Sequence, residues 1–302
     1  MKKLFKWIGI LLGVVIILLV LGAGAVYMMS NARFSKTYAI DPAPVAVPAA
    51  DSSVLAQGAH IAVIRGCQEC HGDDLGGKVF IDDPALGTLY AGNLTAGAGG
   101  AGVRYDNLAW VRAIRHGIDP DGRALLFMPS HEFYFIDDRD LGRLIAYLKQ
   151  VPRVDREFPA STVGPLGRAL FMAGELPLVP AELIDHETPT PEAPPPGATA
   201  EYGQYLAVVC MGCHGEGFSG GPIPGVPPDW PPAANITFDE TGLADWSEED
   251  FFTLLRTGKR PDGRDLNPAY MPWRPMSQMT DEETRALWLF LQSLPHKPAG
   301  NR

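Results

Sequence analysis

The sequence predicts an all-α chain in which one N-terminal transmembrane helix precedes a tandem repeat of two small helical domains. Three observations lead to this prediction: an apolar run near the N-terminus, a set of landmarks that recurs along the chain, and amphipathic stripes of helical period without an alternating strand pattern of useful length. The 302 residues suffice for two domains with accessory segments, and 28 prolines and 33 glycines indicate long irregular loops.

Residues 1–29 are expected to form a membrane anchor. Three lysines (Lys2, Lys3 and Lys6) precede an apolar stretch of roughly 23 residues, close to the ~20 that a helix needs to cross a bilayer. The lysines predict a cytoplasmic N-terminus, with the rest of the chain in the periplasm of a bacterium, beside its inner membrane. A cleaved signal peptide is the alternative, because Ala23-Gly24-Ala25 resembles a cleavage site, but apolar cores of signal peptides usually span about 7–15 residues. We expect the anchor to be retained.

The remaining chain divides by composition and repetition. Residues 30–53, with prolines among small residues, predict an extended tether that lifts the first domain off the membrane. Between the repeats, a partly apolar segment with Leu166, Leu170 and Phe171 predicts a short helix on the first domain, and a proline-rich run predicts a semi-rigid linker. The expected boundaries are domain 1 at 54–152, connector at 153–200, domain 2 at 201–296 and a tail at 297–302.

The two predicted domains carry the same landmarks in the same order. The first copy has Cys67-Gln-Glu-Cys70-His71, Asn93-Leu-Thr95, Arg115-His-Gly117, Asp121-Gly-Arg123 and Met128-Pro129. The second copy has Cys210-Met-Gly-Cys213-His214, Asn235-Ile-Thr237, Arg256-Thr-Gly258, Asp262-Gly-Arg264 and Met271-Pro272. One identical offset relates the cysteines, the Met-Pro pairs and the terminal prolines Pro152 and Pro295 of the two copies. So many landmarks in one order indicate a duplicated unit.

Helices are expected before each cysteine motif and at the end of each copy. Leu141, Leu144, Ile145 and Leu148 follow the i, i+3, i+4, i+7 pattern of an amphipathic helix, which Asp137 can cap. Capping boxes predict two further helix starts in the second copy, at Ser247 with Asp250 and at Thr280 with Glu283. Residues 61–65 and 202–209 are expected to lead helically into the cysteine motifs.

All four cysteines lie in C-x-x-C pairs, Cys67/Cys70 and Cys210/Cys213, and a histidine follows each pair at once. C-x-x-C-H predicts covalent attachment of haem c, with His71 and His214 as proximal iron ligands. A zinc ribbon would place its two pairs about 15–20 residues apart, whereas most of a predicted domain and the whole connector separate Cys70 from Cys210. A thioredoxin-like dithiol would need a βαβ context, which the sequence lacks.

Met128 and Met271 are predicted as the distal iron ligands. Both follow their proximal histidine at the same distance along the chain, whereas the positions that match Met276 and Met279 in the first copy are Phe133 and Ile136, which cannot bind iron. His131 is the competitor in the first copy, but the second copy has an arginine there. His/Met ligation is typical of electron-transfer haems with raised potential.

Other recurring residues are expected to support these sites. The Asn-x-Thr pairs suggest loop residues that bond near the haem edge, so that Asn235→Ala should shift the potential of the second haem. The Asp-Gly-Arg pairs are interpreted as turns, with Gly122 and Gly263 supplying backbone freedom, and their arginines as candidates for pairing with a haem propionate. His60, His116, His186 and His296 have no repeat partner and are interpreted as structural or solvated.

The net charge of −10 argues against a nucleic-acid partner, because a phosphate backbone needs a basic surface. It permits docking onto a partner protein that presents a basic patch.

With these motifs the chain resembles the class I cytochrome c family, and more narrowly the multi-haem cytochrome subunits of membrane-bound bacterial alcohol and aldehyde dehydrogenases. The resemblance covers each repeat and includes Pro261-Asp-Gly-Arg264 and Tyr270-Met-Pro-Trp273. It implies a tandem of two class I cytochrome c domains, two covalent haems c and one-electron transfer; the dehydrogenase subunits usually carry three haems, and this chain has two motifs.

The function that follows is a periplasm-facing dihaem c-type cytochrome of a respiratory chain. It would relay single electrons from a dehydrogenase or quinol-oxidising complex to a soluble cytochrome or terminal oxidase, without catalytic residues of its own. The alternative is a dihaem redox enzyme such as a peroxidase or thiosulfate dehydrogenase. Such an enzyme needs an iron with an open site or an unusual distal ligand.

Overall fold

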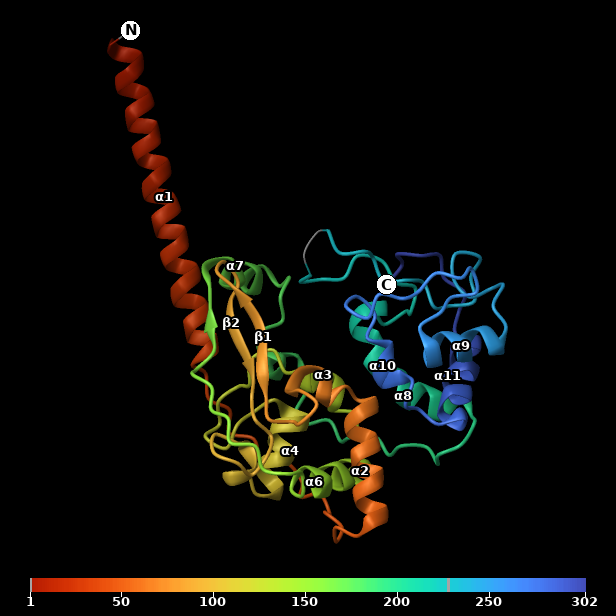
Figure 1. The fold of residues 1–302 in the computed structure, drawn as a ribbon. Coiled ribbons are helices and arrows are strands. Elements are labelled where there is room, and N and C mark those ends of the chain that lie inside the picture. Colours follow the sequence, from red (N-terminus) through yellow and green to blue (C-terminus); the bar gives the residue numbers. More distant parts are fainter. Residues whose placement is uncertain (1, 227–228) are drawn as a thin grey trace.

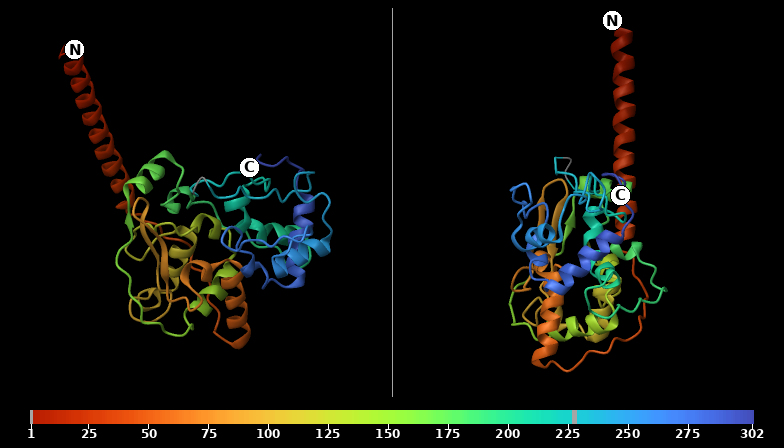
Figure 2. Two further views of the ribbon diagram at one scale, coloured as in Figure 1. Left: turned by 45° about the horizontal axis from the view of Figure 1, so that its top comes forward. Right: turned by 90° about the vertical axis from the view of Figure 1, so that its right-hand side faces the viewer.

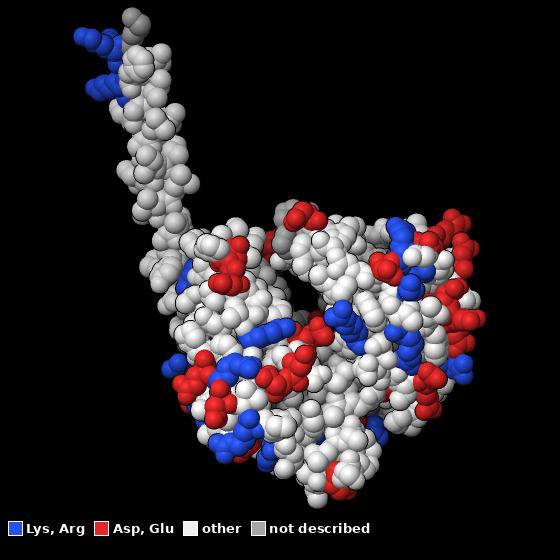
Figure 3. Space-filling view, viewed as in Figure 1, with Lys and Arg blue, Asp and Glu red and all other residues white. Residues whose placement is uncertain are grey.

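In a computed structural model, which describes residues 2–226 and 229–302, a long helix stands out from a mostly helical body (Figure 1). The body has two halves that lie side by side in Figure 1 and in the left view of Figure 2. The helix, α1, spans Lys2–Phe34 and ends in the first half. Met1, the first residue of the expected anchor, lies outside the described residues. On the face that Figure 3 shows, basic side chains gather near the N-terminal tip of α1, and the helix between this tip and the body is uncharged.

α1 is long and apolar enough to cross a membrane, with a mean hydropathy of 2.9 in its most apolar window and none of that window buried in the body. The connector holds the C-terminal end of α1. The Arg33 guanidinium pairs with the Glu182 carboxylate and lies 3.8 Å from the Phe171 ring centroid. Arg168 donates a 2.7 Å hydrogen bond to the hydroxyl of Ser30, which is fully buried. These contacts fix the exit of α1 from the body.

The segment expected to be a free tether packs against the first half instead. α1 continues to Phe34, beyond the expected end of the anchor, and the chain that follows is bonded to loops and helices of this half. The Tyr38 amide donates to the Gly122 carbonyl at 2.8 Å, and Arg112 donates to the Ile40 carbonyl at 3.0 Å. Val45 is 7% exposed in the core. Burial of its side chain favours this packed course over a solvated spacer.

The first half is built on α2 and α6, which pack against each other. They cross at Gly58, where an added Cβ would lie 2.3 Å from the carbonyl oxygen of Arg143. The predicted stripe of α6 is buried in the core beside Trp110, and Asp137 caps the helix by accepting from the Asp140 amide at 2.7 Å. The helices of this half are α2 (Ser52–Ile64), α3 (Cys67–His71), η1 (Ala101–Val103), α4 (Asn107–His116), α5 (Ser130–Phe133) and α6 (Asp138–Leu148).

The second half is built on α8 and α11, which pack against each other. Gly203 lies at their crossing, where an added Cβ would lie 1.9 Å from the carbonyl oxygen of Ala286. The capping boxes predicted at Ser247 and Thr280 are confirmed. The helices are α8 (Ala200–His214), α9 (Glu248–Thr257), α10 (Trp273–Met276) and α11 (Asp281–Ser293).

A small antiparallel sheet distinguishes the first half and was absent from the all-α prediction. Its order is β1-β2-β3, from Lys78–Asp83, Gly87–Ala91 and Thr162–Val163. β1 is mostly exposed, so its side chains show no alternation that a sequence pattern could register. Buried Leu89 of β2 instead joins a cluster with Phe171 and Leu178. Residues 2–226 and 229–302 are therefore mostly helical with one small sheet.

The connector contributes Phe171 and Leu178 to that cluster. The short helix predicted there is confirmed as α7 (Pro165–Ala173), and η2 (Pro180–Leu183) follows it. α7 packs against α1, and Phe171 stacks on Phe34 with ring centroids 4.9 Å apart. The connector thus supports the C-terminal end of α1.

The two halves are packed directly on each other. α5 of the first half contacts α8 of the second, and α10 of the second contacts α2 of the first. The Tyr205 hydroxyl donates to the Asp140 carboxylate at 2.9 Å, and His60 Nε2 lies 2.9 Å from the Glu283 carboxylate. Asp140 and Glu283 are related by the same offset as the two cysteine motifs, so matching positions of α6 and α11 hold these two contacts.

Candidate haem sites

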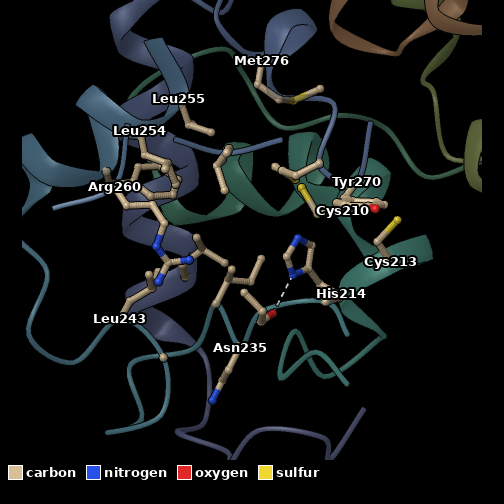
Figure 4. Close-up of a pocket in the computed structure, with 18 of the residues that line it drawn as sticks. Cys210, Cys213, His214, Asn235, Leu243, Leu254, Leu255, Arg260, Tyr270 and Met276 are labelled. Atoms are coloured by element: carbon tan, nitrogen blue, oxygen red, sulfur yellow. Dashed lines mark hydrogen bonds between the residues drawn. The ribbon is translucent and has the colours of Figure 1, made fainter. Parts of the chain in front are cut away.

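His214 is the last residue of α8, and its side chain faces a cavity of about 390 Å³. Its Nδ1 lies 2.8 Å from the carbonyl oxygen of Ala234, the dashed line in Figure 4. A carbonyl can only accept, so Nδ1 carries the proton and Nε2 keeps a free lone pair. Burial lowers the pKa of His214, which favours the neutral imidazole that binds metal ions.

The first half presents its histidine in the same way. Nδ1 of His71 lies 2.7 Å from the carbonyl oxygen of Gly92, and burial lowers the pKa of this imidazole too. In α8 the motif continues an unbroken helix, whereas in the first half Gly66 interrupts the path with a φ of 72° and α3 begins at Cys67. The two histidines therefore make equivalent hydrogen bonds from different local backbones.

The cysteine thiols border the sites as free thiols. Burial raises the pKa of Cys67 and of Cys210 to about 12, and it also raises the pKa of Cys70 and Cys213. All four are therefore protonated near neutral pH. Cys210 and Cys213 line the cavity together with His214 (Figure 4).

The chemistry of the cavity wall fits a flat apolar group with an anionic edge. Much of the wall is apolar: Leu243, Trp246, Phe251, Leu254, Leu255 and Leu287. Arg260 also lines it, and its buried Nε has no hydrogen-bond partner among the residues that the structure describes. The Asp262 carboxylate lies 3.5 Å from this Nε, outside hydrogen-bonding geometry. A carboxylate bound in the cavity would satisfy this donor.

Two thioethers line the same cavity. Met271, the predicted distal ligand, is joined by Met276 of α10, which has no methionine counterpart in the first copy (Figure 4 labels Met276). Met279 is 4% exposed in the core of the second half. In the first half, Met128 is partly buried against the core that contains Trp110, and so is Cys67.

Comparison with known proteins agrees with this chemistry. Residues 200–295 match the family described as Cytochrome c. These residues form a cytochrome c domain. A cytochrome c domain implies a covalently bound haem c, and the thiols, histidine and apolar cavity of residues 200–295 are the donor set and the surroundings that such a haem requires.

Several relatives are named as cytochrome subunits of dehydrogenases. This cytochrome is 30% identical to the cytochrome c subunit of the quinone alcohol dehydrogenase of Gluconacetobacter polyoxogenes, over 83% of this chain and 58% of that protein. It is 28% identical to the corresponding subunit of Gluconobacter oxydans, over 83% and 57%. The fructose dehydrogenase cytochrome subunit of Gluconobacter japonicus is 27% identical, over 89% of this chain and 57% of its own length. This cytochrome thus spans less than two thirds of these relatives.

The Asn-x-Thr pairs anchor the loops whose carbonyls contact His71 and His214. Asn235 follows the carbonyl that His214 contacts, and its side-chain amide donates to the Lys297 carbonyl at 2.7 Å. Asn93 follows Gly92 and donates to the Val154 carbonyl at 2.7 Å. Both side-chain oxygens accept from the amide two residues on, at 2.9 Å. Each asparagine therefore fixes the carbonyl that orients its histidine.

The recurring arginines divide into two groups. Arg115 pairs with Asp138 at 2.7 Å and Arg256 with Asp281 at 2.8 Å, so this landmark ties α4 and α9 to the starts of the closing helices. The Asp-Gly-Arg segments are turns, as predicted, with φ of 80° at Gly122 and 83° at Gly263. Arg264 lines the cavity, but its guanidinium pairs with Asp262 at 2.6 Å. Arg260, which no repeated motif pointed to, is the arginine whose buried donor is free.

His60, His116, His186 and His296 have protein partners or are exposed. His60 contacts Glu283, and Nδ1 of His116 lies 2.9 Å from Nδ1 of His186. His296 is exposed. His131 belongs to α5, and its Nδ1 is buried without a hydrogen-bond partner among the described residues.

Proposed function

We propose that this protein is a membrane-anchored dihaem c-type cytochrome that relays single electrons. The observation that carries the proposal is the repeated geometry of the two C-x-x-C-H motifs. In each, the histidine donates from Nδ1 to the carbonyl that precedes an Asn-x-Thr pair, which leaves Nε2 free to bind iron. A single functional motif would not need a second histidine held in this way.

Each haem would be held by residues of one half. Thioether bonds would form at Cys67 and Cys70 in the first half and at Cys210 and Cys213 in the second. His71 with Met128, and His214 with Met271, would supply the axial ligands. When bound, haem c supplies an iron that exchanges one electron. Two axial ligands leave no open position for a substrate, which supports a carrier over a peroxidase or thiosulfate dehydrogenase.

The protein's residues would tune this chemistry. The Ala234 carbonyl fixes the His214 tautomer and raises its basicity. The apolar wall excludes water from one side of the site, which raises the potential of a His/Met haem. Arg260 would donate to a propionate, because its buried Nε otherwise lacks an acceptor among the described residues.

A dehydrogenase is the proposed electron donor, because the relatives are named as cytochrome subunits of dehydrogenases. A soluble cytochrome or a terminal oxidase would accept the electrons. α1 would remain as the anchor in the inner membrane, with the lysines on the cytoplasmic side and both halves in the periplasm. Mass spectrometry of the purified protein should recover the peptides of residues 7–25, which cleavage after Ala25 would remove.

The test is the haem content of the purified full-length protein. A pyridine haemochrome assay should give two haems c per polypeptide. The paired variants Cys67→Ala/Cys70→Ala and Cys210→Ala/Cys213→Ala should each retain one haem, and each serves as the control for the other. The oxidised protein should show the weak Fe–S(Met) charge-transfer band. One haem in the unmodified protein, or a high-spin iron that binds peroxide, would overturn the proposal.

A further inference from the structure

Arg65 lies between the two cysteine motifs. It follows α2 directly, two residues before Cys67, and is 7% exposed. The guanidinium crosses to the second half, where it lies 4.7 Å from the ring centroid of Tyr205. It donates to the carbonyl of Tyr205 at 3.3 Å and more weakly to that of Leu206 at 3.5 Å. The side chain thus joins the two helices that lead to the two attachment sites.

The carbonyls it contacts are close to the second motif along the helix. In an α-helix the carbonyl of residue 206 accepts from the amide of residue 210, so Arg65 bonds to the turn of α8 that ends at Cys210. Ile64, the last residue of α2, is buried in the core of the second half beside Leu206. The Arg65 guanidinium and the neighbouring Ile64 side chain therefore both hold the two cysteine motifs close to each other.

The charge of Arg65 has no close counter-charge. No carboxylate lies within 4.0 Å of its guanidinium in the part of the chain that the structure describes. Its field reaches both motifs: burial raises the pKa of Cys67 and Cys210 to about 12, and Arg65 opposes that rise at each thiol. Burial of a charge without a carboxylate partner costs free energy, so such a residue is retained where the protein uses its charge.

We propose that Arg65 is a positioning residue that couples the two haem sites, because it fixes the contact between their attachment helices and its positive charge raises both reduction potentials. The inference rests on the proposed presence of two haems. Reduction adds one negative charge to each haem, and a buried positive charge stabilises that product at both sites. In an effective dielectric of about 20, removal of the unit charge on Arg65 should change the equilibrium constant for reduction of each haem on the order of tenfold. This change corresponds to a shift of about 59 mV in each reduction potential.

Two variants separate charge from contact. Arg65→Gln removes the charge but keeps amide donors for the carbonyls of α8, whereas Arg65→Lys keeps the charge and loses the planar guanidinium. Arg104→Met is the control, because Arg104 is an arginine of the first half whose side chain is 60% exposed and paired with Asp121. Spectroelectrochemical titration of the detergent-solubilised, full-length holoprotein measures both midpoint potentials.

Both potentials should fall in Arg65→Gln and stay near those of the unmodified protein in Arg65→Lys and in Arg104→Met. A shift at one haem alone, or no shift beyond the control, would overturn the role of Arg65. If Arg65→Gln does not take up both haems, Arg65→Lys decides, since a fall in its potentials beyond the control would contradict a role for the charge. Haem content is counted on the unmodified protein first. One haem there refutes the proposed function, whereas two haems with unchanged potentials in Arg65→Gln refute the inference alone.

Discussion

Nδ1 of His214 donates a 2.8 Å hydrogen bond to the carbonyl oxygen of Ala234, the residue immediately before Asn235. The asparagine is bonded in turn to Lys297, beyond the end of α11, at 2.7 Å. Orientation of the imidazole therefore depends on a chain of contacts from the C-terminal segment through Asn235 to the loop. Partners of this kind tune the metal as well as hold the ligand.

Replacement of Asn235 by alanine should shift the potential of the second haem and leave that of the first unchanged. The variant loses its bonds to Lys297 and Thr241, so the Ala234 carbonyl is no longer held against His214. Loss of these buried bonds should lower the free energy of unfolding by about 1–3 kcal/mol. Potentiometric titration measures the shift, and Asn93→Ala, which should affect the first haem instead, is the matched control. An unchanged second potential would contradict this role.

Replacement of Gly203 by alanine should loosen the packing of α8 on α11. The new Cβ would lie 1.9 Å from the Ala286 carbonyl oxygen, so the helices must separate. Overpacking of this kind typically destabilises by about 1–3 kcal/mol. Denaturant unfolding followed by circular dichroism measures the change. Gly13→Ala in α1, where nothing lies within 4 Å, should leave the body unaffected, and equal stability of both variants would contradict a close crossing.

The features that sequence predicted best are those set by neighbouring residues. The stripe of α6, the capping boxes at Ser247 and Thr280, and the glycine turns at Gly122 and Gly263 depend on local geometry, and each is confirmed. The apolar length of α1 is of the same kind. Local rules determine such elements because each is stabilised by contacts within a few residues.

Contacts between distant segments were missed. The sheet was missed because β1 is mostly exposed and Leu89 becomes buried only against the connector. The burial of Val45 in the first core makes the expected tether part of the body. Arg260 was missed for another reason: it does not recur, because the residue that matches it in the first copy is Asp119. The sequence does contain a signal for the two helix crossings. Gly203 lies inside the predicted helical segment 202–209, and Gly58 lies shortly before the predicted segment 61–65.

The contact between His60 and Glu283 should make stability depend on pH. The hydrogen bond to Glu283 raises the pKa of His60, against desolvation, from its ordinary value of 6.5. Burial of Glu283 alone would raise its pKa, but the bonds from His60 and Thr280 outweigh burial and hold it below 4.5. The raised pKa of His60 gives stability that is full below 6.5 and is lost as the pH rises through the folded value. The lowered pKa of Glu283 gives stability that is full above 4.5 and is lost as the pH falls.

The pair should therefore contribute most between about pH 4.5 and 6.5, by about 1 kcal/mol. His60→Gln should remove that contribution in this window and change little at pH 9, where His60 is neutral in both the folded and the unfolded protein. Unfolding free energies across the pH range measure the difference. His296→Gln, at an exposed histidine, is the control. A loss of equal size at pH 6 and pH 9 would show that charge plays no part.

Met271 and Met276 both line the cavity, so their separate replacement identifies the distal ligand. Met271 has a counterpart in Met128 at the same distance from its histidine, whereas the counterpart of Met276 is Phe133. Met271→Ala should therefore remove the Fe–S(Met) charge-transfer band of the second haem and lower its potential, because a thioether ligand favours reduced iron. Met276→Ala should keep the band and change only the packing of α10. If Met276→Ala lost the band and Met271→Ala kept it, Met276 would be the distal ligand of the second haem. It would also mean that the two halves bind their haems with different loops, against the equal spacing from which Met128 was predicted.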